Sequence, residues 1–183
     1  MNLKENVSNQ MLVLRCHKQD TLAFEKLVEF WEPRLYYYVH RLIGSKNDVW
    51  DVLQDVWMSV FVGLRKLQDT QNFPTWLFRI AHNKAVDWLR KENKYLQATK
   101  ELEFKCSEST IKYSDIKEQV GLVHKTLNKL KLVHSEVLIL YFLEDFSVKE
   151  MSEILGVSEG TVKSRLHYAK HHLLKALKGV KHV

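Results

Sequence analysis

Glycine and proline are scarce in this chain, with 6 and 2 occurrences among 183 residues. Only a few segments alternate apolar and polar residues as half-buried strands do. Long apolar runs are missing too, since the longest, residues 137–143, falls far short of the ~20 residues that cross a bilayer. The N-terminal stretch MNLKENVSNQ lacks the apolar core of a signal peptide. These shortages predict an all-α fold in a soluble, cytoplasmic protein.

Cysteine is nearly absent as well. Cys16 and Cys106 stand far apart in no metal-binding spacing, so we expect two reduced thiols. His167, His171 and His172 lie close together near the C-terminus, but they lack the cysteine or HExxH partners of a zinc site. We therefore expect no metal and no other cofactor, and no constellation of residues supports an enzyme.

Acidic residues are outnumbered by basic ones. Lys and Arg total 28 against 22 Asp and Glu, which gives a net charge of +6. This balance suits nucleic acid or an anionic membrane surface, although a merely soluble basic protein has the same balance. The length suits one medium domain or two small ones.

Apolar residues with helical spacing are plentiful in the N-terminal part. Residues 9–44 predict three helices with two breaks between them. Asp20 and Thr21 can cap the second helix, and Pro33 fits the first turn of a third one. Gly44 ends that helix.

A stretch rich in Ser, Thr, Glu and Lys, residues 94–116, interrupts the helical periodicity. Residues 117–177 resume it as four helical segments. We therefore predict two small helical domains, residues 1–94 and 117–183, joined by a flexible linker at 95–116.

Residues 48–64 are apolar almost all round the expected helix, with three Asp and no Lys or Arg. The polar exceptions recur every three or four residues, so they form one narrow stripe. This acidic stripe consists of Asp48, Asp51, Asp55 and Ser59. We expect the rest of the helix to be buried. The stripe is either a solvated face or a docking face for a basic partner.

Residues 75–94 predict a basic amphipathic helix, with five basic and two acidic residues. The outward face contains Arg79, Asn83, Val86, Asp87 and Arg90. Trp76 stands at its entrance and Phe73 in the preceding loop. Charges and exposed rings at one place suit single-stranded nucleic acid, whose phosphates meet the charges and whose bases stack on the rings. Core packing is the alternative for both rings, and it weighs less for Phe73.

The C-terminal segments have the spacing of a helix-turn-helix. Ser147 and Glu150 form a capping box, Gly156 breaks the first helix and Ser158 caps the second. The first turns of such a second helix enter the DNA major groove. Here they carry Thr161, Lys163, Ser164, Arg165, His167 and Tyr168. An ordinary helical hairpin is the alternative.

Three stretches together resemble the extracytoplasmic-function sigma factors of bacterial RNA polymerase. LAFEKLVEFWEPRLYYYVHRLIGSKNDVWDVLQDVWMSVF resembles the opening of the family's second conserved region, and FPTWLFRIAHNKAVDWLRKE its promoter-melting part. LNKLKLVHSEVLILYFLEDFSVKEMSEILGVSEGTVKSRLHYAKHHLLKAL resembles its fourth region. The last stretch alone would also suit a response-regulator output domain.

The resemblance implies binding roles for the residues that match the family's motifs. A docking face for the coiled coil of the largest polymerase subunit would comprise Asp48, Asp51, Gln54 and Asp55. Capture of a flipped non-template base of the minus-ten element, and contacts beside it, would involve Asn72, Phe73, Trp76, Arg79, Asn83 and Arg90. The minus-thirty-five element would be read by Ser158, Thr161, Lys163, Ser164, Arg165, His167 and Tyr168. Trp50 and Tyr168 depart from the family's usual residues.

The expected function is therefore that of an alternative sigma factor, whose partners would be core RNA polymerase, duplex and single-stranded promoter DNA, and an anti-sigma factor. A DNA-binding regulator with a helical sensor lobe is the second hypothesis, and it needs neither a base-capture loop nor an acidic docking helix. A helical protein-binding adaptor is the third, and it leaves the two basic helices unexplained.

Overall fold

The computed structural model of the chain describes residues 3–44, 46–99 and 130–178. All regular structure in these three ranges is helical, so the predicted fold class is confirmed for them. The chain divides into two units, Met1–Glu108 and Ser109–Val183. The N-terminal unit and the C-terminal unit are described separately below.

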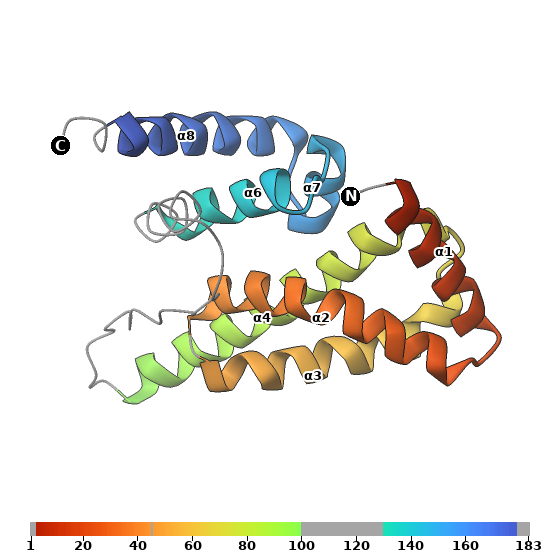
Figure 1. The fold of residues 1–183 in the computed structure, drawn as a ribbon. Coiled ribbons are helices and arrows are strands. Elements are labelled where there is room, and N and C mark those ends of the chain that lie inside the picture. Colours follow the sequence, from red (N-terminus) through yellow and green to blue (C-terminus); the bar gives the residue numbers. More distant parts are fainter. Residues whose placement is uncertain (1–2, 45, 100–129, 179–183) are drawn as a thin grey trace. The chain divides into compact units, whose positions relative to one another are not determined.

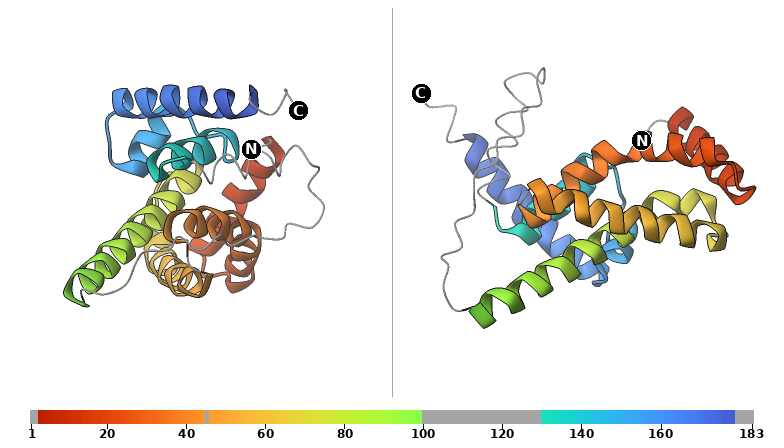
Figure 2. Two further views of the ribbon diagram at one scale, coloured as in Figure 1. Left: turned by 90° about the vertical axis from the view of Figure 1, so that its left-hand side faces the viewer. Right: turned by 90° about the horizontal axis from the view of Figure 1, so that it is seen from below.

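The N-terminal unit is built on three mutually contacting helices, α2 (Thr21–Ile43), α3 (Lys46–Gly63) and α4 (Phe73–Thr99) (Figures 1 and 2). The helix α1 (Leu3–His17) packs on α2 and on the connection between α3 and α4. That connection contains two short 3-10 turns, η1 (Leu64–Lys66) and η2 (Thr70–Asn72). The buried core of the N-terminal unit includes Trp31, Leu35, Tyr38, Leu53, Val56, Val60, Leu77 and Phe78.

The start of α2 is closed by Asp20, as the sequence predicts. Its carboxylate accepts a hydrogen bond from the Ala23 amide at 3.1 Å and another from Arg15 Nε at 2.8 Å. These hydrogen bonds, the Arg15 one foremost, lower the pKa of the Asp20 carboxyl because they stabilise its charged form. At the other end Gly44 adopts a φ of +78° and donates to His40 O, which ends the helix.

The predicted break at Pro33 is wrong, because α2 continues through this residue. A proline inside a helix costs about 3 kcal/mol through a lost hydrogen bond and a steric clash. Here Leu27, Trp31 and Leu35 carry one buried stripe across the proline, and all three are almost completely buried. Pro33 itself is exposed. Burial of the apolar stripe therefore outweighs the local preference.

The boundaries of α4 also differ from the prediction. The helix begins at Phe73 rather than Thr75, and it extends to Thr99, five residues into the segment expected to be linker. Pro74 occupies its first turn, where a proline is tolerated because its missing N–H has no helical partner. The remainder of the predicted linker and the first of the four C-terminal segments, residues 117–129, lie outside the described residues.

The C-terminal unit contains α6 (Leu132–Phe142), α7 (Val148–Leu155) and α8 (Glu159–Lys178), and each contacts the other two (Figure 1). The first half of the apolar run at residues 137–143 forms its core. Phe142 and Leu143 are about half exposed, however, because α6 ends there. The core of this unit includes Val137, Leu138, Ile139, Leu140, Met151, Ile154, Leu155, Val162, Leu166 and Ala169.

Cys16 lies in the core of the N-terminal unit, where burial raises the pKa of its thiol to about 11. A thiol with such a pKa stays protonated and unreactive at neutral pH. Cys106 falls outside the described residues. Within the described ranges, no three metal-ligating side chains converge on one point, and no helix is both long and apolar enough to cross a membrane.

Candidate nucleic-acid and protein interfaces

The acidic stripe lies on the outer side of α3. Asp51, Gln54 and Asp55 are exposed, and Asp48 is half-buried near the start of the helix. Ser59, the last member, donates a hydrogen bond to the Asp55 carbonyl at 2.9 Å and so serves the helix itself. Within the described parts of the chain, none of the three aspartates forms an ion pair. Their negative potential is therefore available to a partner.

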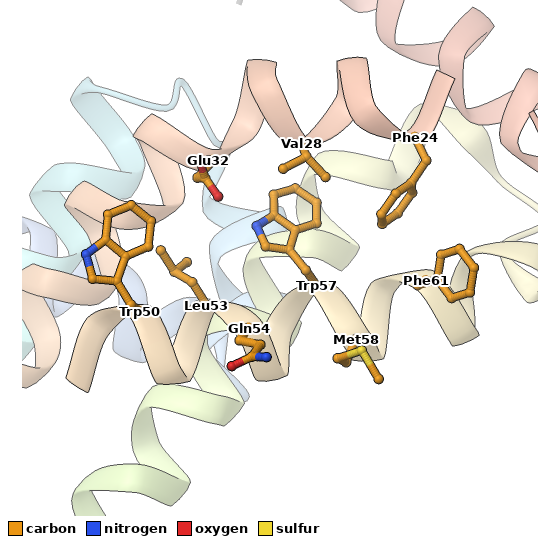
Figure 3. A pocket seen from close by; sticks show the side chains of 9 residues that line it. All are labelled: Phe24, Val28, Glu32, Trp50, Leu53, Gln54, Trp57, Met58 and Phe61. Atoms are coloured by element: carbon orange, nitrogen blue, oxygen red, sulfur yellow. The ribbon is translucent and has the colours of Figure 1, made fainter. Parts of the chain in front are cut away.

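An apolar groove of about 440 Å³ runs beside the acidic stripe, between α2 and α3 (Figure 3). The groove is lined by Phe24, Val28, Glu32, Trp50, Leu53, Gln54, Trp57, Met58 and Phe61. Trp50, Met58 and Phe61 are each more than half exposed. The prediction that α3 is buried outside its stripe is therefore wrong. In the described part of the chain, α2 and α4 are the helices that pack along α3, and they leave part of its apolar surface open.

Aromatic contacts give the groove a fixed shape. Phe24 on α2 meets Phe61 and Trp57 on α3 edge to face, with ring centroids 5.3 and 6.1 Å apart. Nearer the other end of the groove, the ring centroids of Tyr36 and Trp50 lie 5.0 Å apart. The Trp57 Nε1 atom is buried and has no hydrogen-bond partner in the described structure.

The side of α2 that borders the groove is also acidic. Glu32 lines the groove, and Glu25 and Glu29 follow the same side of α2 at helical spacing. Glu25 and Glu29 are exposed. The groove thus has acidic residues on both of its helices. Sequence reasoning missed this second row because only the fold brings α2 alongside α3.

The structure corrects the placement of Phe73. Its side chain is completely buried, with its ring 6.1 Å from that of Trp31, so the core interpretation is right and the exposed one is wrong. Trp76 is half-buried. Part of the Trp76 side chain is therefore open to solvent, whereas the ring of Phe73 is not available for stacking on a base.

The connecting loop, residues 67–72, is held in place by contacts at both ends. The Asp69 carboxylate accepts a hydrogen bond from the Gln71 amide at 3.0 Å and starts η2. Just before the loop, His17 Nε2 lies 2.9 Å from the Leu64 carbonyl, so α1 anchors the connection. Gln71 is exposed and Asn72 is half-buried. The loop therefore presents polar side chains from an ordered backbone.

The outward face of α4 agrees with its sequence pattern. Arg79, Asn83 and Arg90 are exposed, while the inward residues Leu77, Ala81 and Ala85 are completely buried. Arg90 forms an ion pair with Asp87, with 3.4 Å between Nη1 and Oδ1, and both side chains are largely exposed. Such a surface pair contributes little to stability and is readily exchanged for a phosphate.

The C-terminal unit contains the predicted helix-turn-helix. Ser147 and Glu150 form the capping box of α7, with Ser147 N donating to Glu150 Oε2 at 2.8 Å. Gly156 has a φ of +63° and ends α7. Ser158 Oγ accepts from the Thr161 amide at 3.2 Å and opens α8. The side chains of Met151, Leu155 and Val162 are buried, and Val157 is half-buried.

The first turns of α8 expose a basic face. Lys163, Ser164, His167 and Tyr168 are exposed, and Thr161 and Arg165 are half-buried. Lys163 Nζ lies 3.6 Å from Glu159 Oε2, again between exposed side chains.

Two hydroxyls of this face are engaged within the helix start. Thr161 Oγ1 lies 2.9 Å from Ser158 Oγ, and Ser164 Oγ donates to the Thr161 carbonyl at 2.9 Å. Ser164 thus commits its proton to the helix, whereas either Ser158 or Thr161 can be the donor between their two hydroxyls. The long basic side chains are further donors of this face.

The stack of His134, on α6, against two side chains of α8 was not predicted. The ring of His134 stacks on Tyr168 and on His172, with centroids 6.4 and 6.2 Å apart. Burial lowers the pKa of His134, and the positive charges of His172, Lys131 and Arg165 lower it further. No sequence signal indicates this cluster, because His134 lies 34 and 38 residues before its two partners.

The comparisons with known proteins agree with this geometry. The Sigma-70 region 2 model matches residues 27–95, and the Sigma-70, region 4 model matches residues 121–173. RNA polymerase sigma factor SigZ of Bacillus subtilis is 30% identical over 155 residues, which span 85% of this chain and 86% of SigZ. ECF RNA polymerase sigma factor SigW of the same organism is 28% identical and spans 88% of this chain and 92% of SigW. This chain belongs to the extracytoplasmic-function sigma factors.

A solved relative supports the same assignment. The sigma factor RpoE in its crystal structure with the anti-sigma factor NepR from Bartonella quintana superposes with a TM-score of 0.71 at 25% identity. The match covers 85% of this chain and 96% of RpoE. As a sigma factor, the protein binds core RNA polymerase and promoter DNA and acts in transcription initiation.

Proposed function

We propose that the polymerase docks on α3 through the acidic stripe and the adjoining apolar groove together. Asp48, Asp51, Gln54 and Asp55 supply negative and polar groups along one side. A partner helix with an apolar seam and basic flanks fits such a surface, because the seam fills the groove while its cations meet the carboxylates.

The connecting loop and the outward face of α4 hold the melted minus-ten strand in this proposal. Asn72 offers an amide to a base edge, and the half-buried Trp76 lies at the start of the same helix. Arg79, Asn83 and Arg90 follow along α4 and suit the phosphates of the strand. Phe73 serves this surface from inside the core, by fixing the first turn of α4.

The first turns of α8 read the minus-thirty-five element as duplex. Lys163 and His167 are assigned to base edges, since they are exposed near the N-terminal end of the helix. Arg165 and the later lysines are assigned to phosphates. Ser158, Thr161, Ser164 and Tyr168 complete the face, with Ser164 Oγ acting as an acceptor because its proton goes to the Thr161 carbonyl.

One observation carries this assignment: a groove with acidic residues on both helices and a basic helix-turn-helix occur in the same chain. A regulator with a sensor lobe requires the second feature but not the first. The protein acts without catalytic residues of its own and works in the cytoplasm, where its template is. An anti-sigma factor regulates it by occupying its polymerase-binding surface, by analogy with the complex of RpoE and NepR.

The decisive experiment is run-off transcription by core polymerase with and without the protein, on fragmented chromosomal DNA of its source. We expect discrete transcripts only when the protein is present, and their 5′ ends identify its promoters. A protein that binds these DNA fragments but leaves core polymerase silent would be a regulator rather than a sigma factor.

A further inference from the structure

Gly63, the last residue of α3, lies against the indole of Trp76 at the start of α4. A Cβ atom built on Gly63 would lie 2.8 Å from Cζ2 and 3.3 Å from Cη2 of that ring. Favourable contact between carbon atoms begins at about 3.5 Å, so no side chain fits while Trp76 keeps its position. The two residues are 13 positions apart in the sequence, at opposite ends of the α3–α4 connection.

The backbone of Gly63 does not itself require glycine. Its φ of −84° and ψ of −23° are ordinary right-handed helical values that any residue adopts. Alanine would even be the better helix former at this position. The approach of the Trp76 ring is therefore the physical reason that residue 63 must lack a side chain.

Trp76 has little room to retreat toward the core. The ring of Phe73 lies 6.1 Å from it on the same helix, and Phe73 is packed in turn against Trp31. Both of these inner rings are almost completely buried. A side chain at residue 63 would therefore push the half-buried indole outward, and with it the first turn of α4.

The first turn of α4 carries the end of the connecting loop. Asn72 immediately precedes Phe73, and the start of the connection is held separately by His17 at Leu64. The contact between Gly63 and Trp76 therefore closes the base of the loop. It sets the distance between the end of α3, where the chain enters the loop, and the start of α4, where the chain leaves it.

We propose that Gly63 is a positioning residue for promoter opening, acting through Trp76. The missing side chain lets the indole lie on the end of α3, and this contact places the connecting loop where it captures a base. The inference rests on the proposed role of the loop, and it assigns to Gly63 a part that is independent of any contact with DNA.

The test is a double-mutant cycle of Gly63→Ala and Trp76→Phe, measured with the holoenzyme on a promoter found by run-off transcription. Permanganate reactivity of unpaired thymines, divided by the amount of holoenzyme bound, reports opening. Gly63→Ala should reduce opening about 5-fold or more, as coupled contacts of this kind do when broken. In the Trp76→Phe background the same change should cost clearly less, because the smaller ring lacks the clashing atoms.

Gly160→Ala is the matched control. It makes the same chemical change in α8, where the nearest atom to the added Cβ is Ser158 Oγ at 3.8 Å. Normalised opening should therefore not change. Thermal unfolding of Gly63→Ala should show that the N-terminal unit remains folded.

If Gly63→Ala opens the promoter as well as an active parent protein does, this inference is overturned and the proposed function is not affected. A loss of equal size with and without Trp76→Phe also overturns it, since the effect would then not pass through the ring. Failure of the parent holoenzyme to open the promoter overturns the proposed function together with this inference.

Discussion

Phe73 packs edge-on against Trp31, with 6.1 Å between the ring centroids, in the centre of the N-terminal unit. A ring in this position stabilises the fold and cannot stack on a base. Phe73→Ala should therefore lower the unfolding free energy by about 3–5 kcal/mol, as expected for an aromatic side chain removed from a core. Urea unfolding measures this change.

Asn72→Ala is the contrasting variant at the neighbouring position. Its side chain is half-buried and outside the core, so stability should change little while promoter opening falls. Loss of opening by Phe73→Ala with unchanged stability would contradict the placement of this ring.

Charge reversal of Asp51 and Asp55 to Lys should weaken the binding of core polymerase. Both side chains are exposed, so the fold should survive. Asp51→Glu with Asp55→Glu keeps the charges and is the matched control. Binding is measured by co-purification with core polymerase at several salt concentrations, since exposed charges lose their effect as salt rises. Unchanged binding of the Lys variant would remove the acidic stripe from the interface.

The apolar half of the same interface is tested by Met58→Glu. Met58 is 63% exposed, so the substitution should leave stability within about 0.5 kcal/mol. It should nevertheless weaken polymerase binding at high salt as well as low salt, because it places a charge in an apolar contact. A loss confined to low salt would instead indicate a purely electrostatic effect.

The Lys163 ammonium group pairs with Glu159 in the free protein and can contact DNA instead. Lys163→Ala should cost about 1–3 kcal/mol at one promoter position if the lysine reads a base. If it holds a phosphate, all sequences should weaken together and the salt slope should fall by about 1. Titrations across single-base changes separate the two outcomes. Affinity equal to the parent on every site would exclude this face from DNA contact.

Removing the competing acid should have the opposite effect. Glu159→Gln frees Lys163 from its 3.6 Å ion pair and removes a negative charge beside the phosphates. We expect roughly a 2- to 5-fold gain in duplex affinity at low salt, which shrinks as salt screens the charge. Weaker binding by Glu159→Gln would show that the ion pair positions Lys163 for DNA.

His134 predicts a pH dependence of the C-terminal unit. Burial and its cationic neighbours hold its pKa below the ordinary value of 6.5, so the unfolded chain binds the proton more readily than the folded one. The contribution of neutral His134 to the unfolding free energy should therefore be fully present above pH 6.5 and be lost as the pH drops below that value. His134→Phe keeps a ring against Tyr168 and should flatten this part of the pH profile.

The measurement for His134 is the urea midpoint, followed by circular dichroism at several pH values. His171→Phe is the control, because His171 is exposed and lies outside the stack on His134. Equal slopes for His134→Phe and the parent would show that His134 does not control the effect.

Features set by neighbouring residues were predicted correctly from the sequence. The capping box of Ser147 and Glu150, the turn at Gly156 and the cap at Asp20 each depend on a few consecutive residues. The break at Pro33 was predicted by a rule of the same local kind. It was wrong because buried residues on both sides of the proline hold α2 together.

Features that depend on how many neighbours a helix has could not be predicted. The apolar pattern of α3 is the same whether its exposed row of Trp50, Met58 and Phe61 meets another helix of this chain or another protein. Burial of Phe73 likewise follows from the position of Trp31 on a distant helix. The acidic stripe was recognised because helical spacing alone aligns its members.

All five tryptophans of the chain, at positions 31, 50, 57, 76 and 88, belong to the N-terminal unit. Their fluorescence therefore follows the unfolding of that unit alone, while circular dichroism follows the helices of both. Two of them, Trp50 and Trp57, line the groove on α3, so a partner that fills it changes their emission. A tryptophan-free partner peptide that fills the groove can therefore be followed without a label, and unfolding of the C-terminal unit leaves the tryptophan emission unchanged.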